Sequence, residues 1–153
     1  MKLESAKILE DRGVSYRLIE LREKAFSVRD VIEYAKEKLD PEEICKTIIL
    51  KDERGNKCAI MLLGNHRISF SKAKRFIGSG VTILKPEEVK ETTGIEVGAI
   101  CPILLRMPIF VDKRVLEKEK INFGSGNHLY GLEVSPKDLE KVIGFRVVDV
   151  AQT

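Results

Sequence analysis

Lys46 lies within an otherwise apolar or small-residue stretch, Ile44-Cys-Lys-Thr-Ile-Ile-Leu50. A short run of this kind is typical of a strand that is buried on both faces. Alternation along the strand puts Lys46 on the same face as Ile48 and Leu50. A lysine there either extends to solvent at the strand end or points into a polar cavity, and the sequence leaves both open. In a cavity, its ammonium group could hold a phosphate or an ester carbonyl, or stabilise a developing oxyanion.

A second candidate is the segment Thr93-Gly-Ile-Glu-Val-Gly-Ala-Ile-Cys-Pro102, in which Gly94, Gly98 and Pro102 are spaced by four. The segment is too apolar for an ordinary surface loop. Glycines allow backbone N–H groups to approach a ligand closely, so such a loop can form an oxyanion hole without side chains. The alternative is a buried turn that packs on the core. The Walker and dinucleotide-binding glycine patterns are both absent.

The third candidate is Phe123-Gly-Ser-Gly-Asn-His128. A Gly-Ser-Gly sequence alone is most often a hairpin turn. His128 could act as a general base, but the sequence assigns no serine or cysteine nucleophile to it, and the Gly-x-Ser-x-Gly elbow is absent. The three cysteines, Cys45, Cys58 and Cys101, are widely spaced, which favours reduced structural thiols over a zinc site. We therefore expect neither a metal nor a cofactor.

Positive charge is concentrated in the middle of the chain. The 153 residues carry a net charge of only +3, yet residues 44–80 contain eight Lys/Arg and two Asp/Glu. Such a basic stretch suits contact with a phosphate backbone, although a solvated helix face is the alternative. No apolar run approaches the roughly 20 residues of a membrane span, and the first residues lack the apolar centre of a signal peptide. We therefore expect a cytoplasmic protein without membrane contact, folded as one domain over residues 1–153.

The elements that must position these residues are short strands and helices. Apolar periodicity and capping residues predict helices over residues 5–12, 28–35 and 69–77, with further helices beginning at Pro86 and Pro136. Alternating segments predict strands at 14–21, 44–51, 57–63, 81–84 and 109–112, two more near Ile121 and Leu132, and a last one at 145–150. Strands outnumber helices and hairpins are present. The expected fold is therefore mixed α/β (α+β), with a central curved, mostly antiparallel sheet and flanking helices.

The order and spacing of these features resemble the YbaK/prolyl-tRNA synthetase editing-domain family. The resemblance is carried by Lys46-Thr47 at the start of an apolar strand, by the Gly98-x-x-x-Pro102 loop, and by a glycine-rich hairpin followed by Ser135-Pro-Lys-Asp-Leu139. It covers nearly the whole chain. It implies a mixed α/β fold and hydrolysis of the ester that joins an amino acid to the 3′ end of a tRNA. Because the chain has no room for a synthetase catalytic domain, such an enzyme would act in trans.

The resemblance also assigns roles to residues. Lys46 matches the family's functional lysine, and the backbone of Gly98 and Ala99 matches the loop that positions the ester carbonyl. The implied substrate-binding residues are Thr47, Gly94, Ile100, Pro102, Ser125, Gly126 and His128. The basic residues expected to contact the acceptor stem of a charged tRNA are Arg67, Lys72, Lys74 and Arg75. The implied mechanism needs no protein nucleophile, because water attacks or a group of the substrate assists.

Two segments depart from the cysteine-specific members of that family. Asn127, His128 and Leu129 stand where those members have basic residues and a glycine, and Ala25-Phe-Ser27 lacks a histidine often found there. The amino acid removed therefore stays open among cysteine, alanine and serine, with proline tRNA as one candidate carrier and an aminoacyl-tRNA synthetase as a candidate partner. The alternatives are a non-catalytic tRNA-binding or regulatory module and a small-molecule binding domain. If the enzyme interpretation holds, Lys46 faces a cleft whose far wall is the Gly98–Pro102 loop.

Overall fold

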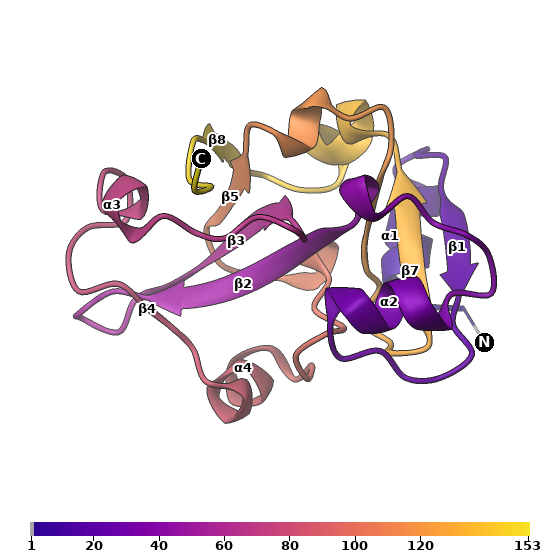
Figure 1. Cartoon of the computed structure of the whole chain (residues 1–153), viewed down its shortest axis with the longest axis horizontal. Helices are drawn as coiled ribbons and strands as arrows, with labels where there is room; N and C mark the ends of the chain where they lie inside the picture. Colours follow the sequence, from indigo (N-terminus) through magenta and orange to yellow (C-terminus); the bar gives the residue numbers. More distant parts are fainter. Residues whose placement is uncertain (1) are drawn as a thin grey trace.

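A computed structural model describes residues 2–153 and contains two β-sheets with short helices around them (Figure 1). The larger sheet has five strands in the order β4-β2-β3-β5-β8. They are β2 (Cys45–Lys51), β3 (Lys57–Leu63), β4 (Thr82–Ile83), β5 (Ile109–Asp112) and β8 (Arg146–Val148). β2 pairs antiparallel with β3 and β4, whereas β5 pairs parallel with β3 and β8.

The smaller sheet is antiparallel and has the order β1-β7-β6. Its strands are β1 (Arg17–Glu20), β6 (Ile121–Gly124) and β7 (Tyr130–Val134). A single parallel bridge between Ile44 and Asn122 links the edge of this sheet to the start of β2. The mixed α/β class with mostly antiparallel pairing is thus confirmed, but the strands form two sheets that meet at this bridge. Figure 1 shows β2, β3 and β4 at one end of the molecule and β1 and β7 at the other, with α2 in front of β7.

Within residues 2–153, four α-helices surround the sheets: α1 (Glu4–Asp11), α2 (Val28–Tyr34), α3 (Phe70–Ala73) and α4 (Pro86–Thr93). The predicted cap of α2 is present, because the Ser27 hydroxyl accepts a hydrogen bond from the Asp30 N–H at 3.1 Å. Two helices differ from the prediction. The basic helix expected over residues 69–77 is only one turn long before it passes into turns, and the final helix is a 3-10 helix (Pro136–Lys141) without a side-chain cap from Ser135. Further 3-10 helices span Pro41–Glu43, Pro102–Leu104 and Val115–Glu117.

Apolar side chains gather in three clusters, and β2 contributes to two of them. Cys45 and Ile49 belong to the largest cluster, while Leu50 belongs to a second one that Ile48 packs against. Lys46 therefore shares the face of Ile48 and Leu50, as alternation predicts. The third cluster fills the space between the small sheet and α2, and its buried members are Ile19, Leu21, Ala25, Leu39 and Ile44. In the part of the chain that the structure describes, no helix is long and apolar enough to cross a membrane.

Candidate active site

A cavity of about 450 Å³ lies where the two sheets meet α2. Its wall comes from the end of β1, residues 25–31 at the beginning of α2, Leu39, the start of β2, Gly64, the turn with Gly98 and Ile100, and the β6–β7 hairpin. The cavity brings together five of the residues predicted from the sequence, namely Lys46, Thr47, Gly98, Ile100 and His128. Lys46 and two residues of the predicted Gly98–Pro102 wall, Gly98 and Ile100, therefore line the same cavity.

Lys46 is half-buried and lines the cavity. Among residues 2–153, no aspartate or glutamate lies within salt-bridge distance of its ammonium group. Burial lowers the pKa of Lys46 below its ordinary value, and the positive charge of nearby Arg67 lowers it further. A partly desolvated cation without a counter-charge is suited to bind an anion or an oxygen that becomes negative during a reaction.

The turn at Gly98, which lines the same cavity as Lys46, is closed by a backbone hydrogen bond in which the Ala99 N–H donates to the Glu96 carbonyl at 3.3 Å. Gly98 occupies it with φ of 93°, a conformation that residues with a Cβ rarely adopt. A Cβ on Gly98 would lie 2.4 Å from the Phe26 Cα and 2.7 Å from the Phe26 carbonyl carbon. The glycine is thus required by close packing against the protein's own backbone, which replaces our expectation that it makes room for a substrate.

Backbone donors remain available in this turn. The Ala99 N–H is used by the turn itself, whereas the N–H groups of Gly98 and Ile100 have no acceptor within residues 2–153. Both residues line the cavity. Unpaired backbone N–H groups in a cavity wall that also includes a lysine provide the elements of an oxyanion hole. Among the backbone groups of this loop, the candidates are therefore those of Gly98 and Ile100, and Ala99 contributes by shaping the turn.

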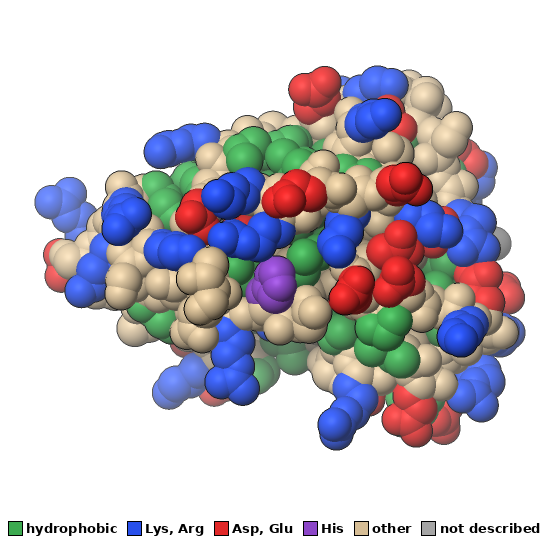
Figure 2. Space-filling view, turned by 45° about the horizontal axis from the view of Figure 1, so that its top comes forward, with side chains coloured by type: hydrophobic (Ala, Val, Ile, Leu, Met, Phe, Trp, Pro, Cys, Tyr) green, Lys and Arg blue, Asp and Glu red, His purple; other side chains and the backbone are tan. Residues whose placement is uncertain are grey.

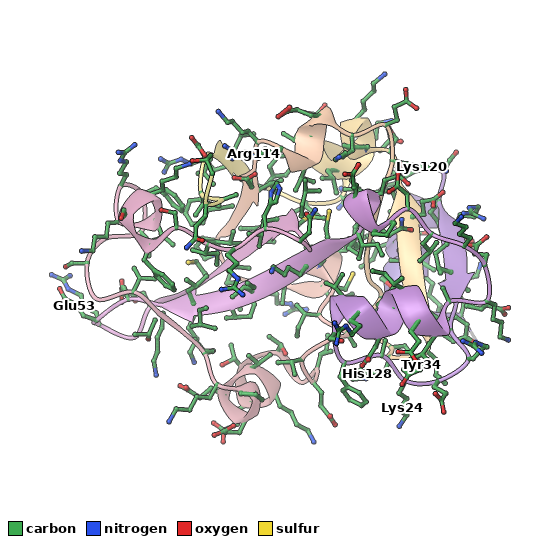
Figure 3. The ribbon with its side chains drawn as sticks, in the orientation of Figure 1. Lys24, Tyr34, Glu53, Arg114, Lys120 and His128 are labelled. Atoms are coloured by element: carbon green, nitrogen blue, oxygen red, sulfur yellow. The ribbon has the colours of Figure 1, made fainter. Side chains whose placement is uncertain are left out.

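His128 connects the β6–β7 hairpin to the same turn. Its Nε2 lies 3.1 Å from the carbonyl oxygen of Val97. A carbonyl can only accept, so Nε2 carries a proton and donates this bond. The imidazole ring also packs against the exposed ring of Phe26 in a tilted arrangement, with 4.6 Å between centroids. In Figure 3, His128 lies in the loop below α2, close to where these segments meet. These contacts indicate that His128 holds the Gly98 turn in place.

Four predicted substrate-binding residues do not line this cavity: Gly94, Pro102, Ser125 and Gly126. Gly94 ends α4 with φ of 76°, and buried Pro102 begins a 3-10 helix. Ser125 is 2% exposed, and its hydroxyl donates to the Tyr130 carbonyl at 2.6 Å. The Gly126 N–H donates to the Ala99 carbonyl at 2.8 Å. The hydrogen bonds of Ser125 and Gly126 fix the shape of the β6–β7 hairpin, which forms part of the cavity wall.

Asn122 is a polar residue of the cavity wall that sequence reasoning missed. It is 3% exposed, and its amide nitrogen and oxygen have no hydrogen-bond partner among the described residues. The hydroxyl of Thr47, also in the cavity wall, is buried and equally without a partner there. The available signal was a polar residue between Ile121 and Phe123 in a short apolar strand, which is the same kind of anomaly that identified Lys46.

The four basic residues predicted to contact nucleic acid fall into two groups. Arg67, Lys74 and Arg75 are exposed and have no acidic partner in the described part of the chain. Lys72 is instead paired with Asp149 at 3.0 Å and donates to the Ala151 carbonyl at 2.9 Å, so it ties α3 to the C-terminal segment. Figure 2 shows Lys and Arg side chains over the whole visible face, with fewer Asp and Glu side chains among them over the half that holds α3 and the β2–β3 hairpin. Arg29 adds an exposed cation at the cavity wall.

The cysteines are poorly suited to nucleophilic chemistry. All three are buried and free, and burial raises the pKa to about 12 for Cys45 and Cys101 and to about 11 for Cys58. Thiols with such pKa values stay protonated near neutral pH and react slowly. Across residues 2–153, no group of three or more His, Cys, Asp or Glu side chains is placed to hold a metal ion.

Comparison with known proteins relates this cavity to a family. Over 100 residues the chain is 27% identical to the uncharacterized protein YwhH of Bacillus subtilis, covering 64% of each chain. Over 76 residues it is 32% identical to a proline–tRNA ligase of Syntrophotalea carbinolica, covering 49% of this chain and 13% of the ligase. The matches therefore span less than two thirds of these relatives.

Comparison of structures agrees on the fold. The chain superposes over its whole length on a candidate trans-editing enzyme for prolyl-tRNA synthetase, with a TM-score of 0.82 and 23% identity. The family model described as the aminoacyl-tRNA editing domain matches residues 23–142, which include every residue of the cavity wall except Ile19 and Leu21. This chain belongs to the aminoacyl-tRNA editing domain family.

Proposed function

We propose that this protein is a trans-acting aminoacyl-tRNA deacylase, which hydrolyses the ester between a small amino acid and the 3′ end of a mischarged tRNA. The observation that carries the proposal is that Lys46 and the Gly98 turn line the same cavity. The wall there combines an unpaired ammonium group with backbone N–H groups that have no acceptor among residues 2–153. Membership of the editing-domain family and its relation to a proline–tRNA ligase support the same chemistry.

In the proposed reaction, water adds to the ester carbonyl and the carbonyl oxygen becomes an oxyanion. The oxyanion lies between the ammonium of Lys46 and the N–H groups of Gly98 and Ile100, which stabilise its charge. The tetrahedral intermediate then collapses, the C–O bond to the tRNA breaks, and the departing ribose oxygen takes up the proton lost by the water. The products are a free amino acid and an intact tRNA 3′ end. No protein nucleophile is needed, which suits a site whose cysteines are buried and protonated.

The tRNA itself binds through phosphates in this proposal. Arg67 is close enough to Lys46 to affect its pKa, and Lys74 and Arg75 extend the exposed basic surface away from the cavity. Such contacts position a nucleic acid without reading its sequence. We therefore assign Arg67, Lys74 and Arg75 to contacts with the acceptor stem and Arg29 to a contact near the 3′ end. Lys72 has a structural role instead, because it is paired with Asp149.

The proposal is tested by incubating the purified protein with tRNAs charged with cysteine, alanine, serine or threonine, and with correctly charged prolyl-tRNA. We expect release of at least one small amino acid at rates far above spontaneous hydrolysis, and no release of proline. Binding of charged tRNA without any release would instead favour a non-catalytic tRNA-binding module of the same fold. Absence of both would exclude a role on tRNA.

A further inference from the structure

Asn122 is a buried amide that lines the active-site cavity. Its strand, β6, turns Ile121 and Phe123 into the main core, while the Asn122 side chain lies on the other face of the strand. That face borders the apolar cluster of Ile19, Leu21 and Ile44 beside α2. Asn122 is thus a polar group in a largely apolar part of the cavity.

Neither polar atom of this amide is used by the protein. Among residues 2–153, the Asn122 nitrogen and oxygen lack any hydrogen-bond partner, and so does the buried hydroxyl of Thr47 on the neighbouring strand β2. Buried polar groups are almost always hydrogen-bonded, because an unpaired one loses its interactions with water without compensation. Three unpaired polar atoms in one cavity wall therefore point to a polar ligand group that completes them.

The surroundings restrict which part of a charged tRNA this group belongs to. The phosphates and the ester are expected near the cations, which are Lys46 and Arg29 in this wall. The walls around Asn122 are apolar and come from β1 and α2, which suits a small side chain rather than a ribose or a phosphate. The part that reaches Asn122 is therefore the side chain of the amino acid.

We infer that Asn122, assisted by Thr47, selects amino acids with a hydroxyl side chain, so that serine or threonine is the group removed. This inference rests on the proposed deacylase function and names its substrate class. A hydroxyl both donates and accepts, and so can pair with the nitrogen and the oxygen of one amide. Alanine or valine would leave the amide unpaired, and a thiol is a weak partner at both positions.

The preference can be measured with matched pairs of substrates on a single tRNA: serine against alanine, and threonine against valine. Each pair differs by a hydroxyl group, so the ratio of kcat/KM values isolates its contribution. Loss of hydrogen bonding to a buried polar group corresponds to roughly 10- to 100-fold in this ratio. We expect the wild-type protein to favour the hydroxyl member of at least one pair by about that factor.

Asn122→Leu keeps the approximate size of the side chain and removes its polar atoms. We expect this variant to bring the ratio close to one while hydrolysis of alanyl-tRNA persists or rises. Its melting temperature should stay the same or increase, because the variant no longer buries an unpaired amide. Thr47→Val is a second variant of similar size, and it should reduce the ratio several-fold. Ile121→Val on the same strand points away into the core and should leave the ratio unchanged.

The outcomes separate the two proposals. A wild-type protein that favours the hydroxyl member of neither pair overturns the assignment of Asn122 while the deacylase function stands. So does a ratio that neither Asn122→Leu nor Thr47→Val changes. A wild-type protein that releases no amino acid from these four substrates or from cysteinyl-tRNA overturns the deacylase function itself.

Discussion

Replacing Gly98 with alanine tests how the catalytic turn is held in place. Two costs are expected from the structure. The φ of 93° at Gly98 is unfavourable for any residue with a Cβ, which costs about 1–2 kcal/mol. The added Cβ would also lie 2.4 Å from the Phe26 Cα and 2.9 Å from the Phe26 carbonyl oxygen. Since backbone atoms must move to relieve that overlap, overpacking adds about 1–3 kcal/mol.

Together these costs predict a loss of about 2–5 kcal/mol in the free energy of unfolding, or roughly 5–15 °C in melting temperature for a domain of this size. Gly94→Ala is a matched control from the same segment. Its φ is 76°, yet nothing lies within 4 Å of its added Cβ. Only the conformational cost then applies, so we expect a loss of about 1–2 kcal/mol. Urea denaturation monitored by circular dichroism measures both.

The two variants should also differ in activity. Displacement of Phe26 or of the turn would misplace the N–H groups of Gly98 and Ile100, so Gly98→Ala should lower kcat even where the protein is folded. Gly94→Ala should keep kcat near the wild-type value, because Gly94 lies outside the cavity wall. Equal losses of stability in the two variants would refute the packing argument. A folded and fully active Gly98→Ala protein would remove the turn from the mechanism.

Three further predictions concern charge and reactivity. Neutralising Lys74 and Arg75 together should raise the KM for charged tRNA and flatten its dependence on salt while kcat stays nearly constant, because phosphate contacts bind ground and transition states equally. An unchanged salt dependence would mean that Lys74 and Arg75 face solvent and do not contact the tRNA. Burial lowers the pKa of Lys46 below its ordinary value of 10.5, so kcat/KM should start to fall before the rising pH reaches 10.5, because the side chain loses its charge. Lys46→Arg keeps its charge to higher pH, so the fall should begin at higher pH in that variant. An identical alkaline limb in both proteins would contradict this. The thiols of Cys45 and Cys101, with pKa near 12, should resist iodoacetamide in the native protein at pH 8 and react once it is unfolded in urea; rapid native labelling would contradict their burial.

The local pattern of the sequence predicted much of the fold. The β2–β3 hairpin, the cap of α2 and the strand Ile109–Asp112 follow from alternation and capping residues in short windows. Lys46 was identifiable for the same reason, since a charge within an apolar strand is locally anomalous. The division into two sheets was not identifiable, because it depends on one bridge between Ile44 and Asn122, which are far apart in the chain.

The roles of the glycines and of the hairpin depended on contacts that no window of sequence contains. Gly98 was expected to approach a substrate, but the backbone of Phe26 occupies the space where a side chain at Gly98 would lie. Ser125 and Gly126 were expected in the cavity, yet their hydrogen bonds hold the hairpin against the Ala99 segment. Lys72 was expected to be free, and its partner Asp149 lies near the other end of the chain. Each difference arises from tertiary packing.

The central claim is that Lys46 stabilises the transition state of ester hydrolysis. Its most direct test is the single-turnover rate of deacylation by Lys46→Met, which keeps the length of the side chain and removes its charge. Lys57→Met is a matched control, because Lys57 is an exposed lysine on β3 outside the cavity wall. We predict that Lys46→Met lowers the rate by about 10²-fold or more while Lys57→Met stays near wild type. A folded Lys46→Met protein that deacylates at the wild-type rate would contradict the account.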